Sequence, residues 1–132
     1  MKPFVDTNVL LYLLSNDADK SAAAETLLKD RVIVSVQVLN EFANVAHRKF
    51  RFSWEEVRAV LVDIVRFSEV HVLTTRTHEL GLDIAERYGF AFYDSLIVAA
   101  ALEAGCKRLL SEDFQHAQRI DGLRIENPFK AA

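Results

Sequence analysis

Short apolar runs rich in β-branched residues alternate along this chain with longer segments whose apolar residues recur at helical spacing. The short runs are typical of strands and cover residues 2–5, 31–35, 69–73, 106–111 and 123–127. One helical pattern lies between residues 35 and 50, where one face carries Val38, Leu39, Phe42, Val45, Ala46 and Phe50. The alternation predicts an α/β fold, a three-layer α/β/α sandwich with a parallel sheet between helices.

Residues at the expected helix ends support this division. Ser53 and Glu56 have the spacing of a capping box, in which each side chain satisfies the other's backbone N–H. Gly89 follows another helical pattern, and glycine ends helices readily because it adopts the left-handed conformation without steric cost. One helix is therefore expected to begin after Ser53 and another to end before Gly89.

Composition narrows the class of protein. The chain has 132 residues, 51% of them hydrophobic and 27% charged, which fits one domain over residues 1–132 with a sizeable core and excludes a disordered chain. The formal net charge of −3 argues against a protein whose main task is to neutralise the phosphates of duplex DNA. A local basic patch can still guide a nucleic acid to an acidic enzyme.

No segment has the features of a targeting signal or of a membrane span. The apolar run at residues 9–14 is shorter than a signal-peptide core, and nothing approaches the ~20 apolar residues that cross a bilayer. The single cysteine, Cys106, permits no internal disulfide and fits a buried apolar position. We therefore expect a soluble, cytoplasmic protein.

Three aspartates stand where an expected strand ends or an expected helix begins: Asp6, Asp94 and Asp113. Each alone is explained as an N-cap, which stabilises a helix by ~0.5–2 kcal/mol. Capping does not explain Glu41, which lies inside an expected helix at the border of its apolar side. Because the carboxyl ends of parallel strands meet at one edge of a sheet, we expect these four acids to share a pocket.

Carboxylates that share a pocket repel one another, so a bound cation is needed to keep them all ionised near neutral pH. An oxygen-rich site without Cys or paired His suits Mg²⁺, with Mn²⁺ as the alternative. None of the histidines has zinc-site spacing: His47, His71, His78 and His116. Such a site can activate water and stabilise charge on a phosphodiester that is being cleaved.

Four segments, in order along the chain, resemble the PIN domain family, and more closely the toxin nucleases of bacterial VapBC toxin–antitoxin pairs. They are FVDTNVLLYLL (4–14), NEFANV (40–45), FYDSLIVAAAL (92–102) and LLSEDFQHAQRIDGLRIENPF (109–129). The resemblance implies a single PIN domain with a five-stranded parallel sheet. It also implies a Mg²⁺-dependent endoribonuclease that hydrolyses single-stranded RNA.

The resemblance also assigns roles to the acids. Asp6, Glu41, Asp94 and Asp113 match the four acids of the family's metal site. Our mechanistic hypothesis is that Asp6, Asp94 and Asp113 hold the metal ion, while Glu41 completes the charge cluster and orients a water for in-line attack on phosphorus. The neighbour of Asp113, Glu112, could exchange roles with it.

Three polar residues match supporting positions of the family. Thr7 and Asn8 match the pair that orders the first loop, and Ser111 stands where the family more usually has threonine. Gln115 replaces an acid that sometimes follows, so any second metal would be weakly held.

The basic run at residues 47–51 has two explanations. Arg48, Lys49 and Arg51 could face the negative end of a helix dipole, at ~0.3–1 kcal/mol each. They could also contact the RNA backbone, with Phe50 or Phe52 available to stack on bases.

Partners follow from the same resemblance: an RNA substrate, a VapB-like antitoxin that covers the acidic site, and a homodimer. The alternative function is a non-catalytic PIN-fold RNA-binding or scaffolding protein, which degenerate acids would favour. A phosphoryl-accepting receiver module fits less well, because residues 6–8 (DTN) offer one acid instead of a pair and LRIENPF (123–129) lacks a lysine.

Overall fold

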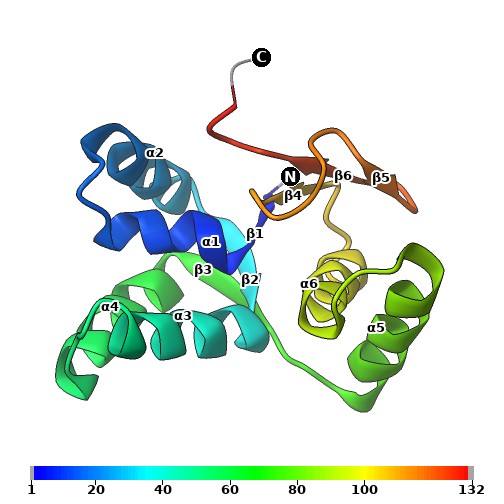
Figure 1. The fold of residues 1–132 in the computed structure, drawn as a ribbon, viewed down its shortest axis with the longest axis horizontal. Coiled ribbons are helices and arrows are strands. Elements are labelled where there is room, and N and C mark those ends of the chain that lie inside the picture. Colours follow the sequence, from blue (N-terminus) through cyan, green and yellow to red (C-terminus); the bar gives the residue numbers. More distant parts are fainter. Residues whose placement is uncertain (1, 131–132) are drawn as a thin grey trace.

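The computed structural model describes residues 2–130 as a mixed sheet with helices packed against it (Figure 1). The elements are β1 Phe4–Val5, α1 Thr7–Leu10, η1 Leu11–Leu14, α2 Ala18–Lys29, β2 Val32–Ser35, α3 Val36–Arg48, α4 Trp54–Arg66, β3 Ser68–His71, α5 Thr75–Tyr88, α6 Phe92–Glu103, β4 Arg108–Leu110, β5 Arg119–Ile120 and β6 Leu123–Glu126. The strand order is β3-β2-β1-β4-β6-β5, and every neighbouring pair is parallel except β5 with β6. The predicted α/β class and its largely parallel sheet are confirmed.

The sheet has six strands, so the expected number of five is wrong. The additional strand, β5, is two residues long and pairs antiparallel with β6 across the dipeptide Asp121–Gly122. Both turn residues have positive φ, 47° and 85°, as a type I′ hairpin requires. Two residues are too few to show an alternating pattern, but the Asp-Gly dipeptide between apolar residues was a usable hairpin signature.

Helices cover both sides of the first strands. In Figure 1, α1 to α4 lie on one side of β1 and β2, and α5 and α6 lie on the other. The core is built from fully buried strand residues such as Phe4 and Leu109 and from α6, whose residues 95–101 are all buried. The first turn of this central helix is therefore held at a defined place beside the ends of β1 and β4.

The helix ends agree with the sequence in part. The capping box between Ser53 and Glu56 is present in both directions, and Gly89 ends α5 with φ 73°. Two N-cap expectations are wrong: Ala91 caps α6, which puts Asp94 inside its first turn, and no helix follows Asp113. Neither Asp94 nor Asp113 therefore serves as a helix N-cap.

Candidate active site

Asp6 lies at the carboxyl end of β1 with only 3% of its surface exposed. Its Oδ1 accepts a hydrogen bond from the backbone N–H of Thr7 at 2.7 Å. Its Oδ2 accepts from the Ser111 hydroxyl at 2.8 Å and from Asn8 Nδ2 at 3.3 Å. These three donors make the burial of a carboxylate tolerable at this point of the chain.

Ser111 follows β4, is fully buried, and connects the loop after β1 to the loop after β4. Besides donating to Asp6, its hydroxyl accepts from Asn8 Nδ2 at 3.2 Å and from the backbone N–H of Asp113 at 3.0 Å. Asn8 Oδ1 in turn accepts from the backbone N–H of Glu112 at 3.1 Å. One hydroxyl therefore fixes two acid-bearing loops relative to each other.

Glu41 lies in α3, which packs against α1. Its Oε1 accepts a hydrogen bond from the Thr7 hydroxyl at 2.9 Å. The bond occupies one carboxylate oxygen and holds the glutamate beside the loop that carries Asp6. Thr7 thus orders the site twice, through its backbone toward Asp6 and through its side chain toward Glu41.

The four predicted acids line one hollow of about 300 Å³. Asp6 and Glu41 contribute from β1 and α3, Asp94 from the first turn of α6, and Asp113 from the loop after β4. The other lining residues are Thr7, Asn8, Leu11, Asn44 and Val45. The fold therefore brings carboxylates from four distant segments to one place.

Crowding and burial shift the pKa values of two of these acids. Burial raises the pKa of Asp6 from 3.8 to about 7, against hydrogen bonds from Ser111 and Thr7 that lower it, and the nearby carboxylates of Asp113 and Glu41 raise it further. Burial and the same two carboxylates also raise the pKa of Asp94. The hollow is a place where negative charge is present in excess and a cation would be stabilised.

Glu112 faces away from this hollow. Its Oε1 accepts a hydrogen bond from the Tyr12 hydroxyl at 2.8 Å, and its Oε2 lies 3.7 Å from Lys20 Nζ. Asp113 and not Glu112 is among the residues that line the hollow. The geometry therefore favours Asp113 over Glu112 as the acid that belongs with Asp6.

The donor set fits a hard divalent cation. The polar side chains that line the hollow offer carboxylate, hydroxyl and amide groups, and oxygen ligands are those that Mg²⁺ and Mn²⁺ prefer. Within residues 2–130, however, no group of three or more His, Cys, Asp or Glu side chains has the geometry to coordinate a metal ion as it stands. The acids line a common hollow without converging on one point.

Asn44 lines the hollow and was not singled out from the sequence. It stands one helical turn after Glu41 on α3, and residues three apart share a helix face. That spacing, present in the quoted segment NEFANV, was the feature that could have identified it.

Arg48, Lys49 and Arg51 do not line the hollow, and all three are exposed. Arg48 ends α3 one turn beyond Asn44, so it lies on the helix face that borders the acids. Lys49 caps this helix, and Arg51 follows with a φ of 60°. The dipole explanation fits their place at the helix end, and that place leaves contact with RNA open as well.

The aromatic residues beside this run differ in exposure. Phe52, considered for stacking on bases, is half-buried and packs against the hydrophobic core. Trp54 is 55% exposed, and its ring stacks on that of His47 at 3.8 Å between centroids. Trp54 is therefore the more accessible ring at this end of α3.

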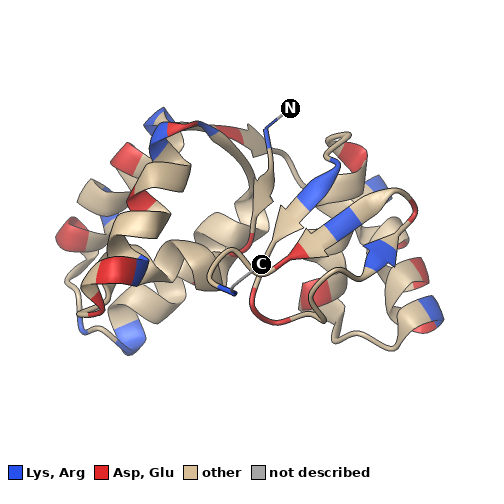
Figure 2. Cartoon of the chain, turned by 90° about the horizontal axis from the view of Figure 1, so that it is seen from above, with Lys and Arg blue, Asp and Glu red and all other residues tan. Residues whose placement is uncertain are grey.

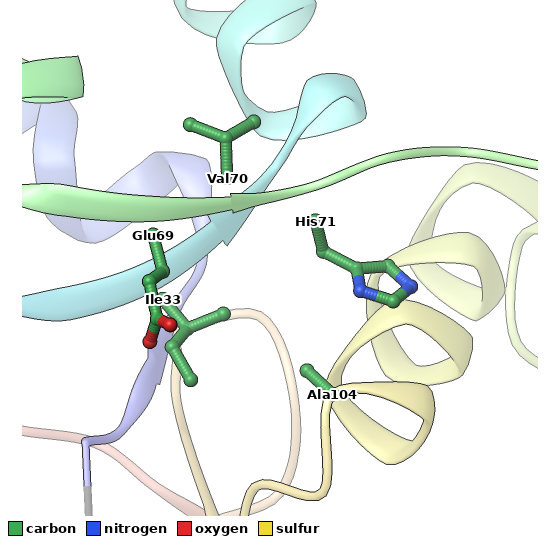
Figure 3. A pocket seen from close by; sticks show the side chains of 5 residues that line it. All are labelled: Ile33, Glu69, Val70, His71 and Ala104. Carbon is green, nitrogen blue, oxygen red and sulfur yellow. The ribbon is translucent and has the colours of Figure 1, made fainter.

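A separate hollow of about 250 Å³ lies at β3, the edge strand of the sheet (Figure 3). Glu69 and His71 lie on one side of the strand and Val70 on the other. His71 Nε2 lies 3.0 Å from Glu103 Oε1. Although burial opposes its ionisation, hydrogen bonds from Thr77 and His71 hold the pKa of Glu103 below its ordinary value. The charges here have partners, which distinguishes this hollow from the one lined by the four acids.

Comparison with known proteins gives one family match. The PIN domain model matches residues 4–123. No curated protein sequence matches the chain. None of the helices formed by residues 2–130 has the length and apolar character needed to cross a bilayer.

Several solved structures share the fold. A toxin–antitoxin complex from Klebsiella pneumoniae has a TM-score of 0.73 at 18% identity, covering 98% of this chain and 100% of that chain. A DNA-bound VapBC from Salmonella typhimurium has a TM-score of 0.72 at 24% identity, covering 97% and 99%. The sarcin-ricin loop cleaving toxin VapC20 from Mycobacterium tuberculosis has a TM-score of 0.69 at 18% identity, covering 85% and 90%.

Proposed function

Because this chain belongs to the PIN domain family, we propose that it is a metal-dependent endoribonuclease that hydrolyses single-stranded RNA and acts as the toxin of a VapBC-type pair. The observation that carries the proposal is the hollow lined by Asp6, Glu41, Asp94 and Asp113. Four carboxylates gathered from separate elements, two of them with raised pKa values, form a site that needs a counter-charge.

Each side chain has a role in this proposal. Asp6, Asp94 and Asp113 hold Mg²⁺ or Mn²⁺, and Glu41, oriented by Thr7, positions the water that attacks phosphorus in line. When bound, the cation supplies a Lewis acid that offsets the charge developing on the phosphate. Asn8 and Ser111 keep Asp6 in place, and the 2.8 Å bond from Ser111 directs one of its oxygens.

The direct test uses the purified chain with a labelled single-stranded RNA. Cleavage is expected with Mg²⁺ or Mn²⁺ and is expected to stop with EDTA. Duplex DNA serves as the control substrate. An RNA that stays intact under all metal conditions would favour the alternative, a non-catalytic PIN-fold RNA-binding or scaffolding protein.

Metal binding separates Asp113 from Glu112. We expect Mn²⁺ to raise the unfolding temperature of the wild type, because an ion that binds only the folded state stabilises it. Asp113→Asn should lose most of this rise, whereas the matched variant Glu112→Gln should keep it, since Glu112 contacts Tyr12 and Lys20 instead. Thermal denaturation with and without Mn²⁺ measures both. A loss confined to Glu112→Gln would reverse the assignment.

The basic run at the end of α3 is proposed to guide RNA to the hollow. Replacing Arg48, Lys49 and Arg51 with Ala should weaken RNA binding and lower the salt slope by about 0.7 for each phosphate that is no longer neutralised. Fluorescence anisotropy at several salt concentrations measures this. Unchanged binding would leave these residues only the role of complementing the helix dipole.

A small antitoxin and a second copy of the chain are the proposed protein partners. The structural neighbours include complexes named as toxin–antitoxin pairs, which supports the first. Apolar side chains left exposed on α4, Trp54 at 55%, Val62 at 57% and Val65 at 43%, offer a surface for such a contact. Gel filtration of the purified chain and copurification from its native host test both partners.

A further inference from the structure

Three arginines stand side by side on neighbouring strands at the other end of the sheet. In the strand register Arg108 of β4 pairs with Arg124 of β6, and Arg124 pairs with Arg119 of β5. Side chains of paired residues point to the same face of a sheet, and neighbouring strands lie ~4.8 Å apart. The three guanidinium groups therefore form one row, here called the arginine row.

The row faces solvent. All three arginines are exposed, while their strand neighbours Leu109, Leu123 and Ile125 are buried against the opposite side. Figure 2 shows basic residues on these adjacent strands with no helix crossing in front of them. The helices α5 and α6 lie on the other side of this half of the sheet (Figure 1). The arginine row is thus on an open sheet face.

The charge of the row is only partly neutralised. Arg108 Nε lies 3.1 Å from Glu126 Oε2. Among residues 2–130, no ion pair involves Arg119 or Arg124. Like charges directly across a sheet destabilise it, so the pairing of Arg124 with Arg108 and Arg119 does not stabilise the fold. A ligand that carries regularly spaced negative charges would relieve the repulsion.

Two hollows flank the row. One of about 550 Å³ is lined by Arg108, Arg124, His116 and Lys130 together with Glu126 and other residues. The other, of about 460 Å³, shares Arg108 and Leu27 with the first and also includes Lys2 and Arg31. Basic groups therefore outnumber acidic ones around both hollows, on a chain whose net charge is −3.

The larger hollow is connected along the chain to the acid-lined site. Asp113 lines the acidic hollow, and His116, three residues later in the same loop, lines the hollow beside the arginine row. The loop is fastened to β6, because the backbone N–H of Ala117 donates to Ile125 O at 2.7 Å. This loop therefore lies between the acidic hollow and the hollow beside the arginine row.

We propose that the arginine row binds the phosphate backbone of single-stranded RNA outside the cleavage site. The inference rests on the proposed ribonuclease function and deepens it, since the row adds a second contact that only a longer RNA reaches. Guanidinium groups suit this ligand because they donate hydrogen bonds to phosphate oxygens bidentately and stay charged at all relevant pH values.

The test compares Arg124→Ala with Arg124→Lys and with Arg76→Ala, which removes one exposed charge from α5. Binding of a long oligoribonucleotide is measured by anisotropy in EDTA at several salt concentrations. Cleavage of the same RNA and of a short one that fills only the acidic hollow is measured with Mg²⁺. Arg124→Ala should weaken binding about 3- to 10-fold and lower the salt slope by about 0.7. Arg124→Lys should restore most of the binding, and Arg76→Ala should match the wild type.

The two RNA lengths separate this inference from the proposed function. The ratio of long-RNA to short-RNA cleavage should fall in Arg124→Ala and in no control. A wild type that cleaves both RNAs, with Arg124→Ala equal to it, would overturn the arginine row and leave the ribonuclease standing. An equal loss in Arg76→Ala, or a loss seen only with duplex DNA or an acidic peptide, would also overturn it. A wild type that cleaves neither RNA would overturn the ribonuclease, and the binding measured in EDTA would still decide the arginine row.

Discussion

Asp6→Asn and Asp94→Asn are each expected to lower the rate of RNA cleavage by about 100- to 1,000-fold, because each removes a charge from the group proposed to hold the cation. Asn keeps the shape of the side chain, so the loss reports charge and not packing. Asp6 is the stronger case, since three donors already direct its two oxygens and a misplaced ligand cannot be replaced from solvent. Initial rates with saturating Mg²⁺ measure the effect.

Asp83→Asn is the matched control, because Asp83 is an exposed acid on α5 that does not line the acidic hollow. It should cleave RNA at the wild-type rate. Full activity in both Asp6→Asn and Asp94→Asn would refute the assignment of these acids. Equal loss in Asp83→Asn would show that net charge, not the site, controls the rate.

Ser111→Ala is expected to have the largest effect on stability outside the apolar core. It removes a fully buried hydroxyl that donates to Asp6 and accepts from Asn8 and from the Asp113 backbone, leaving buried polar groups unsatisfied. Such a loss costs about 1–3 kcal/mol. For a chain of this length it should lower the unfolding temperature by roughly 3–15 °C. Cleavage should fall about 10- to 100-fold as well, because Asp6 and Asp113 lose a shared anchor.

Ser111→Thr is the matched control, since it keeps the hydroxyl. It should recover most of the activity that Ser111→Ala loses, whether or not the extra methyl group costs some stability in a fully buried position. A Ser111→Ala protein with wild-type stability and activity would contradict the role assigned to this hydroxyl. Thermal denaturation and cleavage rates on the same preparations decide it.

The carboxylates that line the acidic hollow are close enough to disfavour one another's ionisation. Asp6 is almost fully buried, and burial together with the carboxylates of Asp113 and Glu41 raises its pKa to about 7, although hydrogen bonds from Ser111 and Thr7 lower it. The pKa of Asp94 is shifted in the same direction. Fixed groups with strongly perturbed pKa values in a hollow are typical of functional sites, where a bound ligand removes the conflict.

Much of the fold was predictable because its signals are local. Apolar runs and helical spacing located the strands and α3, and Ser53 and Gly89 marked helix ends that the structure has. The fold did not follow from the pattern where elements are short. β5 has two residues and is held by pairing with β6, so only its Asp121–Gly122 turn could have indicated it.

The acids of the site were predictable as a set, but their arrangement was not. Placing Asp6 and Asp113 near strand ends and Asp94 near the start of a helix followed from the sequence. The N-cap explanation failed for Asp94 and Asp113 because a helix boundary depends on neighbours several residues away. The hydrogen bond between Asp6 and Ser111 joins residues 105 apart. The hydrogen bond that engages Glu112, and not Asp113, comes from Tyr12, which is far from both in the sequence. A pattern of neighbouring residues cannot indicate contacts between residues so far apart in the sequence.

The arginine row could not be predicted from the sequence for the same reason. Arg108, Arg119 and Arg124 are ordinary exposed residues along the chain, and only the register of three strands aligns them. The net charge of −3 gives no indication of such a basic face. Net charge therefore describes the surface as a whole and does not show how charge is distributed over one face.

Diffraction from crystals of the protein soaked in Mn²⁺, recorded so that manganese scatters anomalously, tests the central proposal most directly. We predict an anomalous peak in the hollow between Asp6, Asp94 and Asp113, with Glu41 beside it, and its absence from crystals of Asp94→Asn. A peak elsewhere on the protein, or an empty hollow at saturating Mn²⁺, would contradict a metal-dependent site built from these four acids.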